Sequence, residues 1–296
     1  MKEIVVIEAP TNLGLKEPAP GIEPGVKFLP AVLEKTGFYK SIGISERMNI
    51  EPPAYSMYLD EASGVRNADA IAGYSKELAA TIKEVIEQDK IPLVVGGDCS
   101  VMIGSCVALK QKGNFGLFHL DGHTDYMWPE FSQTKAAAGM GLALVAGAGH
   151  EKLTNIDGLM PYIKEENIFC VGNREYDETY VGLSLKSNMH YIDLIGIRAQ
   201  GIENIVHDFL QMVERKRLDG FWIHFDVDAL NDEIMPCVDS RTEDGLWYDE
   251  LKKMLKPLIQ SPYFTGMEIT ILDPTLDKDG KYIRPFVKEM AEIFKA

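Results

Sequence analysis

The sequence predicts an α/β fold with a mainly parallel central sheet. Strand-like and helix-like segments alternate along the 296 residues, which is the pattern of βαβ units. Several strand-like segments are continuous apolar runs, as expected of strands that are covered on both faces. The helix-like segments carry apolar residues at intervals of three and four. Because no repeat, low-complexity tract or linker divides the chain, we expect a single domain over residues 1–296.

The amino-terminal third begins with a strand and a long loop. A β-branched run at residues 4–7, closed by Ala9-Pro10, predicts the strand. Residues 11–25 are rich in proline and glycine, and a loop of this length in a compact domain is either functional, an assembly element or a plain connector. The next expected elements are a helix over 26–34, a strand over 39–44 and a long helix over 67–88.

Three buried strands follow, and each ends in polar residues. The apolar run 91–95 ends in Gly96-Gly-Asp-Cys-Ser100, the run 115–120 in Asp121-Gly-His-Thr-Asp125, and the run 221–225 in Asp226-Val-Asp228. Further strands are expected at 167–171, 190–193 and 265–271, and helices at 101–110, 136–146, 202–217, 248–258 and 287–294. Strands and helices thus alternate to the end of the chain.

Composition and charge narrow the class of partner. The formal net charge of −15 argues against nucleic acid or a phospholipid surface, since both are polyanions. The four cysteines (Cys99, Cys106, Cys170 and Cys237) show no CxxC spacing, which is typical of reduced thiols in a cytosolic protein. No apolar run approaches the roughly 18 residues of a membrane span, and the short apolar start with Glu3 is unlike a signal peptide. We therefore expect a cytoplasmic protein.

The segment after the second buried strand predicts a metal site. Asp121, His123 and Asp125 fall at i, i+2 and i+4, so an extended backbone points all three side chains to one side. Two carboxylates and an imidazole that converge in this way repel and desolvate one another unless a cation lies between them. A lone DxD, by contrast, is often only a helix cap or a turn.

The other polar strand ends are expected at the same place. Parallel sheets carry their sites at the carboxyl ends of the strands, where all three polar segments lie. The pooled candidate metal ligands are Cys99, Asp121, His123, Asp125, Asp226 and Asp228. Four carboxylates balance two divalent ions, and two such ions can activate a water and stabilise the oxyanion formed when it attacks. This set predicts hydrolysis of a polar C–N or C–O bond.

The motifs GGDCS, LDGHTD and FDVDAL resemble those of the ureohydrolase family of arginases, agmatinases and formimidoylglutamases, whose usual forms are GGDHS, DAHxD and FDVDxxDP. Val171-Gly-Asn-Arg174 and residues 266–274 resemble two further strands of that family. The resemblance covers about residues 90–275. It implies a three-layer α/β/α sandwich, two manganese ions, and hydrolysis of guanidino or formimino groups of a small molecule by a metal-bridging hydroxide. It also implies homotrimers or homohexamers.

Four positions depart from the family pattern. Cys99 stands where the family has a histidine ligand, and Met127 where it has an asparagine that helps to hold an amino-acid substrate. Ala138-Gly139 replaces an active-site histidine, and Ile271 replaces the glutamate that binds a guanidinium. Five of the six metal-ligand positions thus match the family while three substrate-binding groups are lost, so we expect a substrate other than arginine.

Cys99 has two interpretations. As a thiolate it is a softer ligand than histidine, which favours Zn, Fe, Co or Ni over Mn, and its place at a helix start favours ionisation. As a neutral thiol it leaves one metal weakly held, so that the site is mononuclear or empty.

Four other side chains are candidates for supporting roles. His119 and His224 each precede a ligand aspartate by two residues, so they are either hydrogen-bonded to carboxylates behind the metal or satisfied core histidines. Asp239 and Arg241 follow the last metal motif and are either a substrate-binding pair or a surface ion pair. Glu268 is expected to be structural.

Two functions from different classes fit this sequence. The first is a binuclear metal-dependent hydrolase of the ureohydrolase type, which cleaves a C–N bond of a guanidino, amidine or amide compound. The second is a catalytically inactive paralogue that serves as a structural or regulatory subunit. A deacetylase-like amidohydrolase shares the topology, but the two-metal ligand set argues against it.

Overall fold

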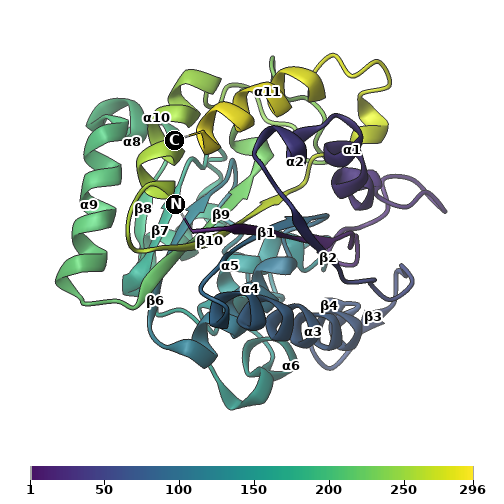
Figure 1. Cartoon of the computed structure of the whole chain (residues 1–296). Helices are drawn as coiled ribbons and strands as arrows, with labels where there is room; N and C mark the ends of the chain where they lie inside the picture. The colour runs from purple at the N-terminus through teal and green to yellow at the C-terminus, as the bar shows by residue number, and fades with distance from the viewer. Residues whose placement is uncertain (1, 296) are drawn as a thin grey trace.

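The computed structural model describes residues 2–295, and an eight-stranded sheet lies at its centre (Figure 1). Its order is β2-β1-β5-β10-β9-β6-β7-β8, and every described pair in it is parallel. The strands are β1 (Ile4–Ala9), β2 (Glu46–Asn49), β5 (Ile91–Gly96), β6 (Phe115–Leu120), β7 (Ile168–Val171), β8 (His190–Ile192), β9 (Gly220–Asp226) and β10 (Phe264–Thr270). A separate small hairpin pairs β3 (Leu59–Asp60) with β4 (Val65–Arg66).

Helices cover both faces of this sheet. Figure 1 shows α3, α4, α5 and α6 on one side and α1, α2, α8, α9, α10 and α11 on the other, and an apolar cluster fills each interface. The α-helices are α1 (Leu29–Lys35), α2 (Phe38–Ser41), α3 (Ala68–Glu87), α4 (Val101–Lys112), α5 (Gly141–Val145), α6 (Glu151–Thr154), α7 (Glu178–Lys186), α8 (Leu194–Gln200), α9 (Ile202–Arg215), α10 (Tyr248–Ile259) and α11 (Ile283–Phe294). The fold is the expected three-layer α/β/α sandwich.

Short 3-10 helices complete the connections. They are η1 (Gly25–Phe28), η2 (Ala138–Met140), η3 (Ile156–Gly158), η4 (Glu165–Asn167), η5 (Val227–Ala229) and η6 (Pro274–Leu276). Among residues 2–295, no helix has both the length and the apolar character that crossing a bilayer requires.

The three apolar runs form central strands, as predicted. Every residue of β5, β6 and β9 is buried. Side chains alternate between the two faces: Phe221 and Phe225 lie in the cluster under α9 and α11, whereas Trp222 lies in the cluster under α3 and α4. Burial of both faces explains why these strands have no polar alternation.

The predicted strand at residues 39–44 is wrong. Phe38 and Tyr39 belong to α2, and they are buried there against the core. The strand lies further along the chain, at β2, on the edge of the sheet beside β1. Its residues alternate between half-buried and exposed, and they are too polar to show a strand signal. The helix predicted over 136–146 is a short 3-10 turn, η2, followed by the single helix α5.

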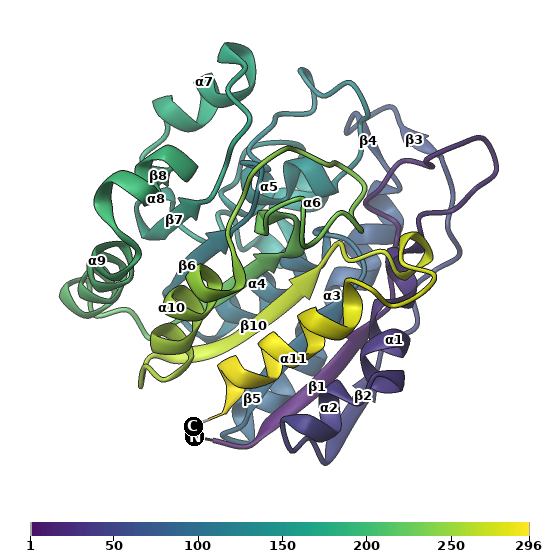
Figure 2. The same cartoon turned by 90° about the horizontal axis from the view of Figure 1, so that it is seen from above.

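Close backbone contacts join the strand ends where the polar motifs lie. A Cβ atom at Gly97 would stand 1.5 Å from the carbonyl oxygen of Thr11, so the loop after β1 packs directly on the loop after β5. The segment that follows β10 also contacts Gly97, since Ile271 N donates a hydrogen bond to Gly97 O across 2.7 Å. Figure 2, viewed from above, shows β1 and β10 running in the same direction. Since β5 pairs in parallel with both, the carboxyl ends of all three strands face one edge.

Candidate metal centre

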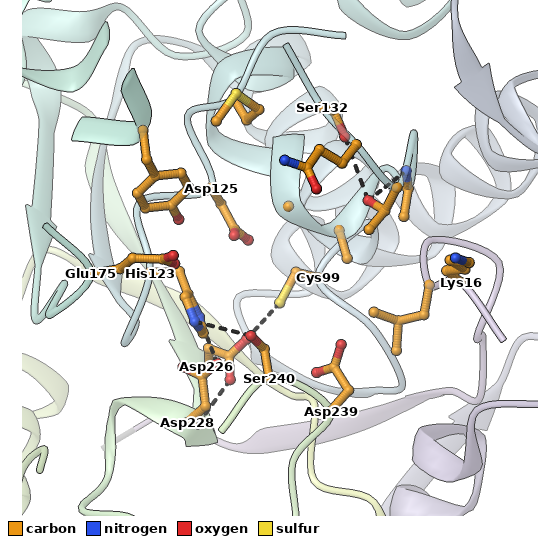
Figure 3. Close-up of a pocket in the computed structure, with 18 of the residues that line it drawn as sticks. Lys16, Cys99, His123, Asp125, Ser132, Glu175, Asp226, Asp228, Asp239 and Ser240 are labelled. Atoms are coloured by element: carbon orange, nitrogen blue, oxygen red, sulfur yellow. Dashed lines mark hydrogen bonds and ion pairs between the residues drawn. The ribbon is translucent and has the colours of Figure 1, made fainter. Parts of the chain in front are cut away.

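The six predicted ligands come together at the carboxyl edge of the sheet. Cys99 lies between β5 and α4, Asp121, His123 and Asp125 follow β6, Asp226 ends β9 and Asp228 lies in η5. A cavity of about 670 Å³ opens above them (Figure 3). Five of the six line this cavity, and Asp121 lies fully buried beneath it. The arrangement places the polar strand ends at the floor of a pocket, as expected for a parallel sheet.

Asp121 is the common member of this cluster. Three groups of side chains bring their ligand atoms within 4.8 Å of one another, and each group contains Asp121. The groups are Cys99, Asp121, His224 and Asp226; His119, Asp121 and Asp125; and Asp121, His123 and Asp228. A carboxylate shared in this way can bridge two cations.

Local turns hold the carboxylates in place. Asp121 Oδ1 accepts the backbone N–H of His123 across 2.6 Å, and Asp226 Oδ1 accepts that of Asp228 across 2.9 Å. Asp228 Oδ1 accepts the N–H of Gly122 across 2.9 Å, which ties the β6 loop to η5. Each of these aspartates thus uses one oxygen locally. The second oxygen of Asp226 faces Cys99, that of Asp228 faces His123, and that of Asp121 has no hydrogen-bond partner among residues 2–295.

The burial and the negative charge of the cluster favour a bound cation. Burial, and then Asp228, raises the pKa of Asp226 well above its ordinary value, and burial, and then Asp121, does the same to Asp125. Burial also acts to raise the pKa of Asp228, but His123 Nδ1, 2.8 Å from Asp228 Oδ2, outweighs it and holds the value at about 2. The buried Asp121 Oδ2 finds no hydrogen-bond partner among residues 2–295. His123 offsets the charge of Asp228 alone, so the other carboxylates fit a further positively charged group.

Cys99 is 1 % exposed and faces carboxylates. Its Sγ donates to Asp226 Oδ2 across 2.9 Å and lies 3.2 Å from Thr270 Oγ1. Burial, and then Asp226, raises the pKa of the Cys99 thiol well above its ordinary value. Burial and the neighbouring carboxylates therefore keep the thiol protonated, and the start of α4 does not offset them. Ionisation of Cys99 requires a cation beside it.

Two fully buried histidines lie behind the aspartates. The rings of His119 and His224 stack with centroids 4.9 Å apart and an interplanar angle of 10°. His224 Nδ1 lies 2.6 Å from Glu268 Oε1, and Ser105 donates to the other oxygen of that carboxylate. His119 Nε2 lies 3.4 Å from Asp121 Oδ2, without hydrogen-bond geometry. Of the two histidines, His224 is the one that forms the expected hydrogen bond to a carboxylate.

The positions that depart from the family pattern lie on the cavity wall. Met127, Ala138, Gly139 and Ile271 all line it. Ile271 is a β-branched residue with a φ of 74°, in the left-handed region that such residues rarely adopt. The wall above the candidate metal ligands is therefore apolar at the three places where the resemblance implies an asparagine, a histidine and a glutamate.

Other polar groups line the cavity that the sequence interpretation did not include. Glu175 and Asp177 come from the segment that leads into α7, Tyr180 comes from its first turn, and Lys16 comes from the proline-rich loop. Tyr180 Oη accepts a hydrogen bond from the backbone N–H of Thr124 across 2.8 Å, and this bond joins α7 to the loop that follows β6. Asp177 caps α7 through its side chain, and an aspartate before a helical segment is a signal that could have revealed this helix.

Asp239 and Arg241 lie apart from each other. Asp239 lines the cavity, and its side chain is open to that space. Desolvation by the surrounding protein, and then the negative charge of Asp228, raises the pKa of Asp239 to about 6. Arg241 instead makes two hydrogen bonds to Asp232, of 2.8 and 2.7 Å. Ser240 lies between them, with Oγ 3.3 Å from His123 Nε2. This geometry favours Asp239 alone as a group that faces a ligand.

Known proteins resemble this chain in sequence and in fold. The sequence model of the arginase family matches residues 2–294. An arginase of Staphylococcus aureus (strain COL) is 28% identical over 287 residues, which cover 94% of this chain and 92% of the relative. The crystal structure of an arginase from Bacillus subtilis is 26% identical with a TM-score of 0.88 and covers 100% of this chain and 99% of its own. A formimidoylglutamase structure from the same species, 20% identical with a TM-score of 0.72, shares the fold over 99% of this chain and 86% of its own.

Proposed function

The chain belongs to the arginase family, and from this we propose that it is a metal-dependent hydrolase of the ureohydrolase type. It cleaves a C–N bond of a guanidino, amidine or amide compound. One observation carries the proposal: six potential ligands from three strand ends converge on the floor of a cavity large enough for a small molecule. The cluster is charged and buried, and its unsatisfied oxygen and raised pKa values fit cations.

Cys99, Asp121, His123, Asp125, Asp226 and Asp228 would hold two divalent ions. Bound there, the ions would make a water nucleophilic at neutral pH and polarise the carbon that it attacks. The family resemblance favours manganese, and the thiol of Cys99 favours Zn, Fe, Co or Ni at its half of the site.

The cavity walls would select the substrate. Asp239 opens into the cavity close to the cluster, and we assign it the cationic part of the substrate. Glu175 and Asp177 add negative charge on the side of the cavity next to α7. Lys16 supplies a positive charge from the proline-rich loop, and it lies in the same view as Glu175 and Asp239 (Figure 3). The apolar Met127 and Ile271 support a substrate other than arginine, since neither can hydrogen-bond its polar ends.

Metal analysis and a substrate screen test this function. Purified protein is reconstituted with Mn or Zn, its metal content is measured, and guanidino, amidine and amide compounds, arginine included, are screened for urea or ammonia release. We expect about two ions per chain, in line with the charge of four carboxylates, and turnover of at least one compound. A chain that binds no metal after reconstitution would overturn the hydrolase. Two bound ions without turnover would favour the inactive paralogue.

We also propose a cytoplasmic location and a homo-oligomer. The four cysteines are buried and free, which suits a reducing compartment. The oligomer is supported by the resemblance, which implies a trimer or hexamer. Size-exclusion chromatography with light scattering gives the mass directly, and a 33.0 kDa species would contradict it.

A further inference from the structure

His224 is fully buried, yet one of its ring nitrogens is left without a partner. Nδ1 is held by Glu268, whereas Nε2 finds no hydrogen-bond partner among residues 2–295. A buried polar atom in this condition is unfavourable, because it has lost its hydrogen bonds to water and gained none in the protein. A satisfied core histidine would use both nitrogens, so its environment indicates that Nε2 serves another partner.

His224 belongs to the only four-member group of potential ligands found in the described chain. A ring nitrogen of His224, Cys99 Sγ and carboxylate oxygens of Asp121 and Asp226 lie within 4.8 Å of one another. His224 precedes Asp226 by two residues in β9, so both side chains leave the strand on the same face. The imidazole therefore approaches the aspartates from beneath, on the side away from the cavity.

The opposite edge of the ring is built as metal-binding histidines are built. Such histidines usually give their second nitrogen to a carboxylate, which fixes the tautomer and strengthens the ligand. Glu268 in β10 fills this place at 2.6 Å, and it is itself held by Ser105 of α4. Three elements thus converge to orient one imidazole, which lies beside Cys99, Asp121 and Asp226 and keeps one nitrogen free.

We propose that His224 is a metal ligand and that it forms, with Cys99, Asp121 and Asp226, a buried site for a zinc-like ion. The inference rests on the proposed metal-dependent function and adds a ligand to it. One thiolate, one imidazole and two carboxylates suit zinc, which prefers four nitrogen, sulfur and oxygen ligands. When the ion binds, Cys99 would lose the thiol proton that it now donates to Asp226, and this proton would be released to solvent. Glu268 is a positioning residue that acts through the ring.

His119 does not have this support, although it lies at the same depth. Its ring stacks on His224, but both of its nitrogens lack hydrogen-bond partners within residues 2–295, so no carboxylate fixes its tautomer. The structure therefore assigns the ligand role to His224 and not to His119.

X-ray absorption at the zinc edge tests the site in the unmodified protein. The full chain is loaded with one equivalent of zinc, and the spectrum reports the atoms around the ion. We expect sulfur and imidazole on the same ion. Zinc bound with sulfur but without imidazole would overturn the role of His224 and leave the hydrolase standing. A protein that binds no zinc and no manganese would overturn both.

Variants provide the second measurement. We expect His224→Gln to lose at least 100-fold in zinc affinity and Glu268→Gln to lose about 10–100-fold, each measured by competition with a chelating dye. His190→Gln, in the edge strand β8, is the matched control and should keep wild-type affinity. In cobalt-loaded protein, the thiolate-to-cobalt absorption should shift in His224→Gln and remain in His190→Gln. Unchanged affinity and an unchanged spectrum in a folded His224→Gln would refute the proposal.

Discussion

The Cys99 thiol donates a hydrogen bond to Asp226 Oδ2 across 2.9 Å, and this bond joins the end of β5 to the end of β9 at the floor of the cavity. Both residues are almost fully buried. A cation that binds here replaces the thiol proton as the partner of the carboxylate. We therefore expect the identity of residue 99 to decide which metal is held.

Substitution of Cys99 is expected to change the metal content. Cys99→Ala should lower the bound metal from about two ions to about one per chain, because one ligand is lost from a site that four carboxylates share. Cys99→His should keep two ions and shift the preference from zinc toward manganese. Elemental analysis after dialysis against mixed metals measures both effects.

Cys106→Ala is the matched control for this experiment. Cys106 is also fully buried, but it lies in α4 within the apolar cluster that contacts α3. It should keep the wild-type metal content. If Cys99→Ala and Cys99→His both leave the count unchanged, Cys99 is not a ligand.

Removal of the metal is expected to destabilise the protein. Asp121, Asp125 and Asp226 lie buried beside one another, and burial raises the pKa of each. A cation at 1,000 times its Kd stabilises the folded state by about 4 kcal/mol, so chelation should lower Tm by about 5–10 °C. Differential scanning calorimetry before and after chelation gives the shift. Re-addition of metal should restore it, and a Tm that does not respond to either step would show that no cation is bound.

Asp239 is expected to bind the cationic part of the substrate. Asp239→Asn should raise KM for a cationic substrate by about 10–100-fold, which corresponds to the loss of one charge-assisted hydrogen bond. A neutral amide substrate should be affected much less. Arg241→Ala is the matched control, because Arg241 pairs with Asp232 and should leave KM unchanged. Equal effects of the two substitutions would contradict the assignment.

Gly122 is expected to tolerate no side chain. A Cβ atom there would stand 2.2 Å from Arg174 Nη1 and 2.8 Å from Asp228 O. Arg174 Nη2 donates to that same carbonyl across 2.7 Å, so a shift of the arginine would disturb η5. Gly122→Ala should reduce the free energy of unfolding by about 1–3 kcal/mol and lower the metal affinity.

Urea denaturation measures this loss against a control of opposite sign. Gly73 lies exposed inside α3, and a Cβ atom there meets nothing within 4 Å. Gly73→Ala should therefore raise the free energy of unfolding by about 0.5–1 kcal/mol. A neutral Gly122→Ala would mean that Arg174 can move without cost.

The central sheet and the convergence of the candidate metal ligands could be predicted because their signals are local. β5, β6 and β9 are continuous apolar runs, and the polar motifs stand directly after them, so the topology of a parallel sheet was enough to bring them together. The edge strand β2 could not be predicted in this way. Its strand conformation comes from pairing with β1, which is a tertiary contact and leaves no apolar pattern in the sequence.

The rest of the cavity depends on contacts that the sequence does not reveal. Tyr180 reaches the cavity because its hydroxyl group is fixed to the backbone of Thr124, 56 residues away. Arg241 and Asp239 are two residues apart, yet the loop turns one toward Asp232 and the other toward the cavity. The position of His224 followed from strand alternation, but its free nitrogen could be recognised only once Glu268 was seen to hold the other one.

The left-handed backbone of Ile271 makes this wall position open to evolutionary change. A β-branched side chain in that conformation costs about 1–2 kcal/mol, so replacement by glycine or asparagine would relieve strain as it alters the cavity. Most exchanges near an active site reduce stability, and a protein can accept few of them. At residue 271 the released strain offsets part of the roughly 2–5 kcal/mol that truncation of a buried isoleucine costs. Selectivity can therefore change there with a smaller loss of stability than at an unstrained buried position, which makes it the first position to vary in a search for new substrates.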